Sequence, residues 1–414
     1  MYGQDIHPNR KSKTLRAIGG HRQHVVLTHN PSTIGPGQTL RLRFPNIGQN
    51  DVIVPKSYFI SFLLLLTGVK DTGRTVVPNI GRRIIKTLKI RFENNDVLTI
   101  ENYDEIMAYF DHWLPKKEKN RRIFQGIHTP AGLKLRVGAK DASGDAEEIA
   151  ISKNLGNRFR IPIDFELLND IGPYNQASLA DKLEIELTFN DAKAVILGST
   201  STLAASADAD YGYSISHIRT EWDQITDPNL AAVMSHQYQL MALPFLRVFN
   251  YKRMCIQKND QIINLNINVP SQSLSYILIL PIDPLDRKPF QNNGVYKNLD
   301  IKKVSITVEG QPNQLYAKSM YKENSFDQIC KIFHENGVSM GEFLTKKYAL
   351  CLDFRPSTDN KMHGNGLELR DPTKGLSLEI ERMPTGTGDL ILYVFLMQDA
   401  QLNIKGGRYN NVVF

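Results

Sequence analysis

The feature that most constrains the fold of this chain is an internal repeat of four short segments. IKTLKIRFEN at Ile85–Asn94 aligns without gaps with IKKVSITVEG at Ile301–Gly310. The other three pairs are QTLRLRF at Gln38–Phe44 with QIINLNI at Gln261–Ile267, DEIMAYF at Asp104–Phe110 with DQICKIF at Asp327–Phe333, and LEIE at Leu183–Glu186 with LEIE at Leu378–Glu381. Amphipathic strands that merely look alike explain one such match, but not four in the same order. The sequence therefore predicts a duplicated domain.

The pattern within the repeat is that of β-strands. In Gln38–Phe44, apolar residues alternate with arginines, which is typical of a strand with one buried face. Ser57–Leu66 and Leu390–Met397 are continuous apolar runs, which predict strands buried on both faces. Helical patterns are sparse, and the clearest are Glu101–Trp113, Pro228–Tyr238 and Ser325–His334. Few helices among many short strands favour an all-β sandwich or barrel over βαβ units.

The domain boundaries follow from loop and cap signals. Gly198–Asp210 is small and polar, as a loop would be, and Tyr211–Trp222 reads as the last strand of the first domain. Asp227 followed by Pro228 is a helix start. We therefore expect a basic N-terminal arm at 1–24, a first sandwich at 25–225 and a second at 226–414. The first copy carries extra residues within Leu114–Arg160, expected to form a projecting loop.

Composition excludes several classes of protein. Lys and Arg number 50 against 43 Asp and Glu, a net charge of +7 that permits a nucleic-acid partner without demanding one. Three cysteines, Cys255, Cys330 and Cys351, do not suit a disulfide framework and favour synthesis in a reducing host compartment. Met1–Gly20 lacks the apolar region of a secretion signal, so the protein is expected not to be secreted. No apolar run approaches the ~20 residues of a transmembrane segment.

Motifs that could carry chemistry are weak. Gly337–Gly341 matches the G-x-S-x-G pattern around Ser339, but that motif needs a strand-to-helix turn, and here a helical segment precedes it. The pair His21 and His24, the segment His363–Gly366, and the pair Asp208 and Asp210 lack companion ligands at metal spacing; we interpret both histidine segments as exposed loop residues. The sequence therefore predicts a protein that is not an enzyme and holds no metal or cofactor.

Two basic stretches leave alternatives open. The N-terminal arm carries five cations that could contact phosphates or a neighbouring subunit, or could remain solvated: Arg10, Lys11, Lys13, Arg16 and Arg22. The second stretch falls in the expected loop: Lys116, Lys117, Lys119, Arg121 and Arg122. It has few interleaved aromatic residues, so a surface for stacking bases is not expected, and solvated loop charge is the favoured interpretation.

One segment adds a resemblance. Pro78–Leu114 combines a glycine- and arginine-containing strand start with a helix that ends near a tryptophan, and its marking residues are Asn79, Gly81, Arg82, Ile85, Lys86, Leu88, Tyr103, Asp104, Asp111 and Trp113. In these residues the segment resembles the central segment of the major capsid proteins of Polinton (Maverick) elements and adintoviruses. Ile34–Pro45 with Val52–Ser57 is similar to the first strands of that family, and Glu221–Leu230 to the connector between its domains. The second half of the chain is supported by the duplication alone.

The resemblance implies a double jelly roll, that is, two tandem eight-stranded jelly-roll sandwiches with a few short helices. It implies a homotrimer whose six similar domains have a pseudo-hexagonal outline and tile an icosahedral virus shell. Expected partners are the chain itself and a penton or minor capsid protein, and the expected location is the virion. The alternative is a tandem jelly-roll carbohydrate-binding protein, because that architecture also hosts lectins.

The C-terminus is expected to take part in assembly. The chain ends in Val412, Val413 and Phe414, and an apolar triplet left in water would form a sticky patch. We expect Phe414 to pack on a neighbouring subunit or under its own domain.

Overall fold

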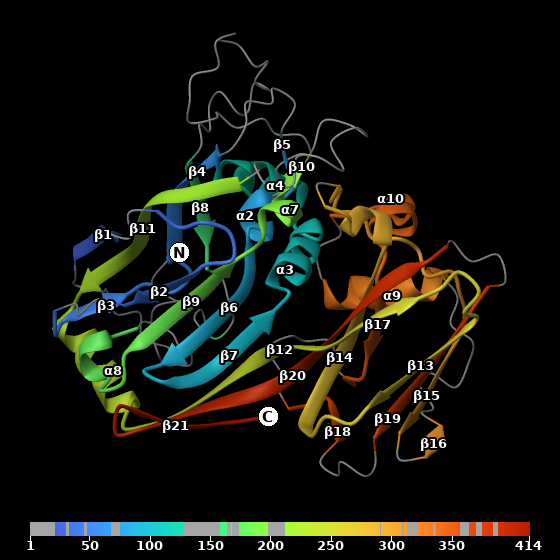
Figure 1. Cartoon of the computed structure of the whole chain (residues 1–414). Helices are drawn as coiled ribbons and strands as arrows, with labels where there is room; N and C mark the ends of the chain where they lie inside the picture. The colour runs from blue at the N-terminus through green and yellow to red at the C-terminus, as the bar shows by residue number, and fades with distance from the viewer. Residues whose placement is uncertain are drawn as a thin grey trace, which may run out of the picture. The chain divides into compact units, whose positions relative to one another are not determined.

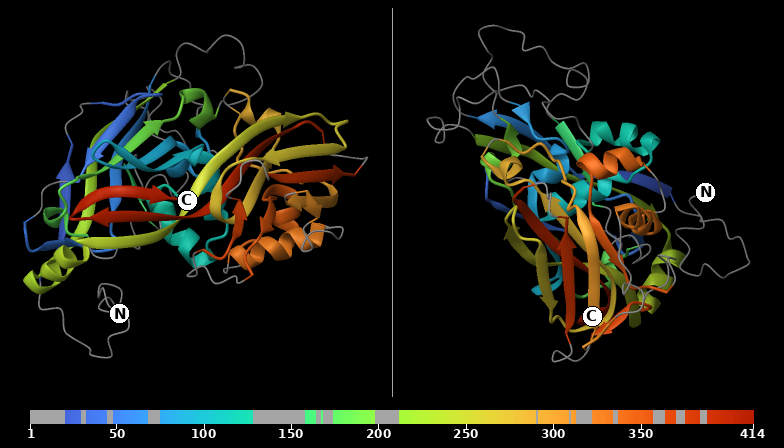
Figure 2. Two further views of the ribbon diagram at one scale, coloured as in Figure 1. Left: turned by 90° about the horizontal axis from the view of Figure 1, so that it is seen from below. Right: turned by 90° about the vertical axis from the view of Figure 1, so that its right-hand side faces the viewer.

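The computed structural model describes residues 21–29, 33–44, 48–67, 75–127, 158–163, 167, 174–197, 212–289, 291–308, 310–312, 322–333, 337–356, 364–369, 375–383 and 388–414. The chain divides into two compact units (Figures 1 and 2). The first unit comprises Met1–Thr99, Arg121–Phe245 and Gln401–Val413, and the second comprises Ile100–Asn120, Leu246–Ala400 and Phe414. The expected boundary near Thr226 coincides with the end of strand β11, and the division of the chain into jelly rolls at that residue stays a prediction.

The first roll has eight main strands in two antiparallel sheets. One sheet has the order β1 (His21–Thr28), β11 (Gly212–Thr226), β4 (Phe59–Thr67), β8 (Arg158–Pro162). The other has the order β2 (Thr39–Arg43), β9 (Leu183–Phe189), β6 (Ile85–Phe92), β7 (Asn95–Glu101). Numbered along the chain, the main strands lie in the orders 1-8-3-6 and 2-7-4-5, which is the arrangement of a jelly roll.

The second roll repeats this order. Its sheets are β12 (Leu240–Ile256), β20 (Leu390–Lys405), β14 (Ser271–Ile282), β17 (Leu350–Asp353), and β13 (Ile262–Ile267), β19 (Leu376–Arg382), β15 (Ile301–Val308), β16 (Gln311–Pro312). Short extra strands are β3 (Asp51–Ile53), β5 (Thr75–Val76), β10 (Ile196–Leu197), β18 (Leu367–Leu369) and β21 (Arg408–Val413). The predicted fold, two tandem eight-stranded jelly rolls, is confirmed.

The strand register confirms the duplication and corrects one alignment. β6 and β15 occupy the same position in their sheets, as the alignment of Ile85–Asn94 with Ile301–Gly310 predicts. Ile90 in β6 pairs with Ile185, and its equivalent Ile306 pairs with Leu378. Ile185 and Leu378 are therefore equivalent, whereas matching the two LEIE segments would equate Leu378 with Leu183. The LEIE alignment was wrong by two residues, a slip that keeps every side chain on its own face and leaves the hydrophobic pattern unchanged.

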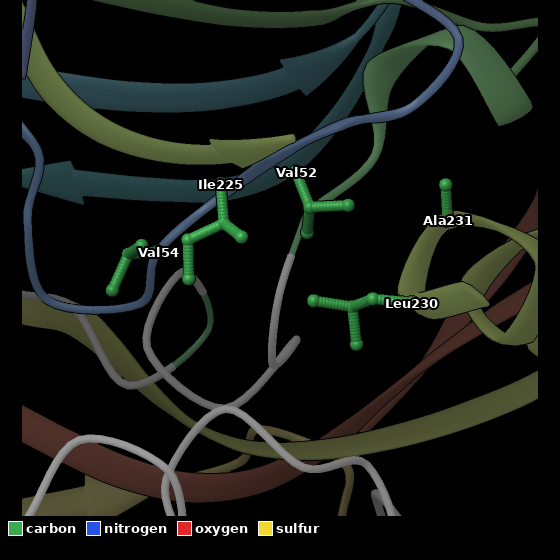
Figure 3. Close-up of a cluster of buried hydrophobic side chains, with 5 residues drawn as sticks. All are labelled: Val52, Val54, Ile225, Leu230 and Ala231. Atoms are coloured by element: carbon green, nitrogen blue, oxygen red, sulfur yellow. The ribbon is translucent and has the colours of Figure 1, made fainter. Parts of the chain in front are cut away.

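The three expected helices are present as α3 (Tyr103–His112), α8 (Pro228–Gln237) and α9 (Lys322–Ile332). Shorter ones are α2 (Ile80–Arg83), α4 (Lys116–Arg122), α7 (Ala192–Val195) and α10 (Met340–Lys346), with 3-10 turns at η1 (Ile123–Gln125), η2 (Gln176–Ser178) and η3 (Pro284–Arg287). As predicted, the Asp227 carboxylate caps α8 by accepting from the Asn229 and Leu230 N–H groups. Figure 3 shows α8 joined to β3 and β11 by one apolar cluster: Val52, Val54, Ile225, Leu230 and Ala231.

Three expectations about individual segments were wrong. The basic stretch Lys116–Arg122 is the helix α4 rather than a loop, while 128–157 of the expected projecting loop lie outside the described residues. His21 and His24 lie in β1, where pairing with β11 gives them a strand backbone rather than the expected loop. β4 has only one fully buried face, because Phe59, Leu63 and Leu65 on its other face are half-buried. β20, by contrast, is buried on both faces along Leu390–Ala400.

Candidate assembly surfaces

The N-terminal strand β1 is fastened to β11 by backbone and charge. It pairs with β11 from His21 to Thr28, Arg22 forms an ion pair with Asp223, and His24 Nδ1 lies 3.0 Å from Asp223 Oδ1. Burial alone would raise the pKa of Asp223, but Arg22 and His24 hold it below its usual value. Arg22 is therefore part of the first roll's sheet. The other predicted arm cations, Arg10, Lys11, Lys13 and Arg16, lie outside the described residues.

A second surface, here called the arginine face, lies on the outer side of the β11-β4-β8 part of this sheet. It consists of Phe59, Leu63, Leu65, Arg158, Arg160 and Arg219. The Arg160 guanidinium lies 3.6 Å above the Phe59 ring and its Nε is 2.5 Å from Glu221 Oε2. Arg158 donates to the Ser61 hydroxyl at 2.8 Å. Burial and the nearby Arg219 charge lower the pKa of Arg158, although Glu221 opposes them.

The outer face of the other sheet of the first roll carries a ladder of ion pairs. Arg41 Nε lies 2.8 Å from Glu186 Oε2, Arg91 Nη1 lies 3.4 Å from the same atom, and Arg43 pairs with Glu184. The carboxylates lie beneath the cations: the Glu184 side chain is 3% exposed and that of Arg43 is 72% exposed. Burial alone would raise the pKa of Glu186, but Arg41, Lys89 and Arg91 hold it below its usual value. The alternating arginines that marked β2 in the sequence therefore neutralise buried glutamates.

The C-terminal tail is a strand. β21 pairs with the end of β20 around a turn at Gly406 and Gly407. The pairing begins with Lys405 opposite Arg408 and ends with Gln401 opposite Val413. The turn is anchored in the first unit, because Gly406 and Gly407 donate to the carbonyls of Gln239 and Tyr238 at 2.9 and 2.8 Å. At the end of the strand, Val412 and Val413 are half-buried and Phe414 is 42% exposed. The Phe414 ring lies 4.0 Å from the Arg247 guanidinium. A role of the tail in subunit contact stays a prediction.

Deleting Asn410–Phe414 is expected to weaken assembly while both rolls stay folded. The segment contributes half-buried apolar side chains whose further burial is worth about 1 kcal/mol, or roughly fivefold in affinity. Particle yield and trimer dissociation on dilution measure the effect. Phe414→Ser is the matched variant that keeps the β20–β21 pairing. Normal particles and unchanged trimer stability in the deletion would exclude this role.

The G-x-S-x-G segment has a structural explanation. Ser339 is the N-cap of α10: its hydroxyl accepts from the Glu342 N–H at 3.3 Å, and the Glu342 carboxylate accepts from the Ser339 N–H at 3.2 Å. This reciprocal pair is a capping box. Gly337 is required by close approach, because a Cβ there would lie 2.1 Å from the Leu114 carbonyl oxygen.

Ser339→Ala is therefore expected to cost about 1 kcal/mol of stability through loss of the cap, with no loss of assembly. Urea denaturation measures the first effect and particle formation the second. A fluorophosphonate probe should leave the wild-type protein unlabelled. Labelling of Ser339 would contradict a purely structural role.

Lys119 is the member of the second basic stretch that the sequence interpretation placed wrongly. Its residue is buried, and its Nζ donates to the Gly337 carbonyl at 2.8 Å. Burial and the Lys347 charge lower the pKa of Lys119 to about 8, with Glu342 opposing them. Lys119 is therefore part of the packing between α4 and the start of α10.

The lowered pKa predicts a pH dependence. An unfolded chain releases the lysine proton near pH ~10.4, whereas the folded protein releases it near pH 8. Between these values the unfolded state binds more protons, so this group makes stability rise with pH. The difference in unfolding free energy between wild type and Lys119→Met should therefore move in favour of the wild type from pH 8 to pH 10. A difference that stays constant would contradict it, because contributions from other groups cancel between the two proteins.

Sequence reasoning missed two buried features of the second unit. Arg382 is 2% exposed, and its guanidinium donates to backbone carbonyls, among them that of Leu299 at 3.3 Å. Its signal was present, since Arg382 continues the inward series Leu376, Leu378, Ile380 of β19. The second feature is an aromatic cluster in which Trp113 stacks on Phe333 at 5.3 Å; its other members include Tyr109, Tyr296, Phe326, Phe343 and Tyr348.

Within the described residues, no group of three or more His, Cys, Asp and Glu side chains could hold a metal ion. Burial raises the pKa of Cys351, and burial with Asp327 raises that of Cys330, while Cys255 is exposed.

The helices in the described part of the chain are all too short or too polar to cross a membrane.

Comparison with known proteins identifies the fold by structure alone. The sequence matches no protein-family model and no curated protein. The structure is similar over nearly its whole length to a chain of the PBCV-1 virus capsid quasi-atomic model, with a TM-score of 0.65 and 10% identity, covering 97% of this chain and 99% of that one. The Faustovirus major capsid protein gives 0.63 and 9% over 97% and 93% of the two chains, and the mavirus major capsid protein 0.51 and 10% over 99% and 94%.

Proposed function

We propose that this chain is the major capsid protein of an icosahedral virus and forms trimeric capsomers that tile its shell. The observation that carries the proposal is the likeness of the whole duplicated chain to capsid subunits, covering 97–99% of this chain and 93–99% of the other chains. A likeness restricted to one roll would have suited any jelly-roll protein. Here both rolls and the order in which they are joined are matched.

The duplication has a physical use in such a shell. Three chains with two similar rolls each present six similar domains around a threefold axis, so the trimer has a nearly sixfold outline. An object of that outline can meet neighbours through similar contacts on all sides. The structure contains two rolls per chain. The trimer and its packing in the shell are what we propose.

We assign the chain more narrowly to the Polinton (Maverick) and adintovirus type. The residues that carry this resemblance hold the fold together. Asn79 is in the left-handed region at φ 59°, the buried Arg82 donates to the Pro162 carbonyl at 3.0 Å, and a Cβ on Gly81 would lie 2.7 Å from the Gly126 carbonyl oxygen. These backbone demands explain why such residues stand at these positions of this chain. The order of motifs along Pro78–Leu114 supports the affiliation.

The proposed partners follow from this role. The chain would contact itself within the trimer and between capsomers, and a penton or minor capsid protein at the vertices of the shell. The protein would be located in the virion after synthesis in a reducing host compartment. A nucleic-acid contact of the basic arm is retained as a secondary proposal, supported by the cations Arg10, Lys11, Lys13 and Arg16 in the sequence.

The mass of the purified protein in solution tests the proposal. Light scattering should give three times 46.9 kDa, or a larger multiple, at micromolar concentration. A monomer under all conditions that preserve the fold would contradict a capsomer role. The alternative, a carbohydrate-binding tandem jelly roll, predicts selective binding on a glycan array without assembly.

A further inference from the structure

The arginine face of the first roll is an incompletely covered sheet surface. Ile60, Phe62, Leu64 and Leu66 of β4 are at most 2% exposed, whereas its outward residues Phe59, Leu63 and Leu65 are only half-buried. In the second roll, the equivalent strand β14 is buried on both faces from Ser273 to Ile282. The continuous apolar sequence of β4 suits burial on both sides, whereas the part of the chain that the structure describes covers its outer side only in part.

The charges of the arginine face are also incompletely matched. Arg160 is paired with Glu221, but neither Arg158 nor Arg219 lies within ion-pair distance of a carboxylate among the described residues. The Arg219 Nε is buried without a hydrogen-bond partner in that part of the chain. Two neighbouring guanidinium groups beside apolar side chains require an anionic group on whatever covers them.

The second roll indicates which element the cover is. There, helix α9 packs on β17, the strand at the same position as β8. The equivalent helix of the first repeat is α3, by the alignment of Asp104–Phe110 with Asp327–Phe333. α3, however, belongs to the second unit, where Tyr109 and Trp113 contact Phe333. Among the described residues, α2 and η1 contact β8, but the helix equivalent to α9 does not pack on it.

We propose that the arginine face binds helix α9 of a second copy of this chain in the trimer, with Asp327 as the anionic partner of Arg158 and Arg219. Asp327 is exposed on α9 and has no ion-pair partner among the described residues. The contact is heterologous, joining the first roll of one chain to the second unit of the next, and a 120° rotation closes it after three chains. This inference rests on the proposed function, because it assumes that a trimer forms.

Charge reversal tests the contact in the full-length protein. Arg158→Glu replaces a repulsion from Arg219 by an attraction, so the thermal stability of the dissociated chain should be unchanged or raised. The same variant should raise the trimer dissociation constant about tenfold or more, because a close interfacial charge pair becomes a like-charge contact. Asp327→Arg should weaken the trimer similarly, and the double variant should recover most of the loss. Sedimentation velocity on a dilution series measures all three.

Lys86→Glu is the matched control, since it makes the same change in net charge at an exposed position of β6, in the other sheet. It should leave the dissociation constant unchanged. A wild-type protein that forms no trimer would contradict the proposed function itself. If the wild type is trimeric and both single variants dissociate like it, the arginine face is not the interface. If the single variants weaken the trimer but the double variant does not recover, α9 is not the partner element.

Discussion

Arg382→Leu is expected to lower the free energy of unfolding by about 3–5 kcal/mol, the cost of breaking a buried charged hydrogen-bond network. Arg382 projects from β19 into the second roll. Its guanidinium donates to four carbonyl groups at 3.2–3.4 Å: Leu299, Gln257, Asp260 and Gly388. These carbonyls belong to the segments that lead into β15, β13 and β20. One side chain therefore ties together three connections. Leucine would remove this donor from all four carbonyls, and of these Gln257 still accepts from the Asp260 N–H at 3.1 Å.

Equilibrium urea denaturation measures this effect, with two comparison variants. Arg382→Lys keeps the charge but loses the fork of donors, so it should fall between leucine and wild type. Lys303→Leu changes an exposed cation on the neighbouring strand β15 and should stay within about 0.5 kcal/mol of wild type. Burial lowers the pKa of Arg382 while Asp300 and Asp260 oppose it, and a guanidinium stays charged under these conditions. An Arg382→Leu protein with the wild-type midpoint would show that water satisfies these carbonyls instead.

Trp113→Ala should have an effect of similar size, about 3–5 kcal/mol, because it opens a large cavity among packed rings. Trp113 is 2% exposed, lies parallel to Phe333 at 9°, and has Phe343 and Phe326 at 6.2 and 6.3 Å. It follows α3, a helix from the first sequence repeat that packs in the second unit. We expect the alanine variant to free α3 and to loosen α9 beside it.

Amide hydrogen exchange localises this change. In Trp113→Ala, protection should fall in α3 and α9 and remain in the β2-β9-β6-β7 sheet of the first unit. Trp113→Phe keeps an aromatic ring and should lose less than half as much stability. The chain has two tryptophans, so Trp222 fluorescence in either variant reports on the first unit alone. Unchanged protection in α3 would mean that Trp113 does not hold the helix.

The sequence predicted those features that depend on neighbouring residues. Alternation in Gln38–Phe44 and the continuous run Leu390–Met397 marked β2 and β20 correctly, because inward and outward side chains of a strand follow from period two alone. The Asp227–Pro228 pair marked the start of α8, because a helix cap also depends only on residues close together in the sequence. The order of the repeats then determined which strands are equivalent, and the two rolls have the same topology.

Features that depend on long-range packing were not predictable. The slip of LEIE by two residues leaves the pattern intact, so only the pairing of Ile306 with Leu378 reveals it. Nothing local to Asp104–Phe110 indicates that α3 packs in the second unit, and nothing in the charged run of α4 singles out Lys119 as buried. The half-covered side of β4 differs in kind. Its apolar sequence suits a covering neighbour, and in the proposed trimer the next chain supplies it.

Electron cryo-microscopy of particles assembled from the purified protein tests the capsid role most directly. We predict closed icosahedral shells whose capsomers have threefold symmetry, a hexagonal outline and six jelly rolls each, with β6 and β15 at equivalent positions around the ring. Such a map would also show whether α9 of one chain covers β4 and β8 of the next. Two results would contradict the account. One is monomers or irregular aggregates under conditions that keep both rolls folded. The other is a capsomer with true sixfold symmetry, in which the same roll occupies all six positions.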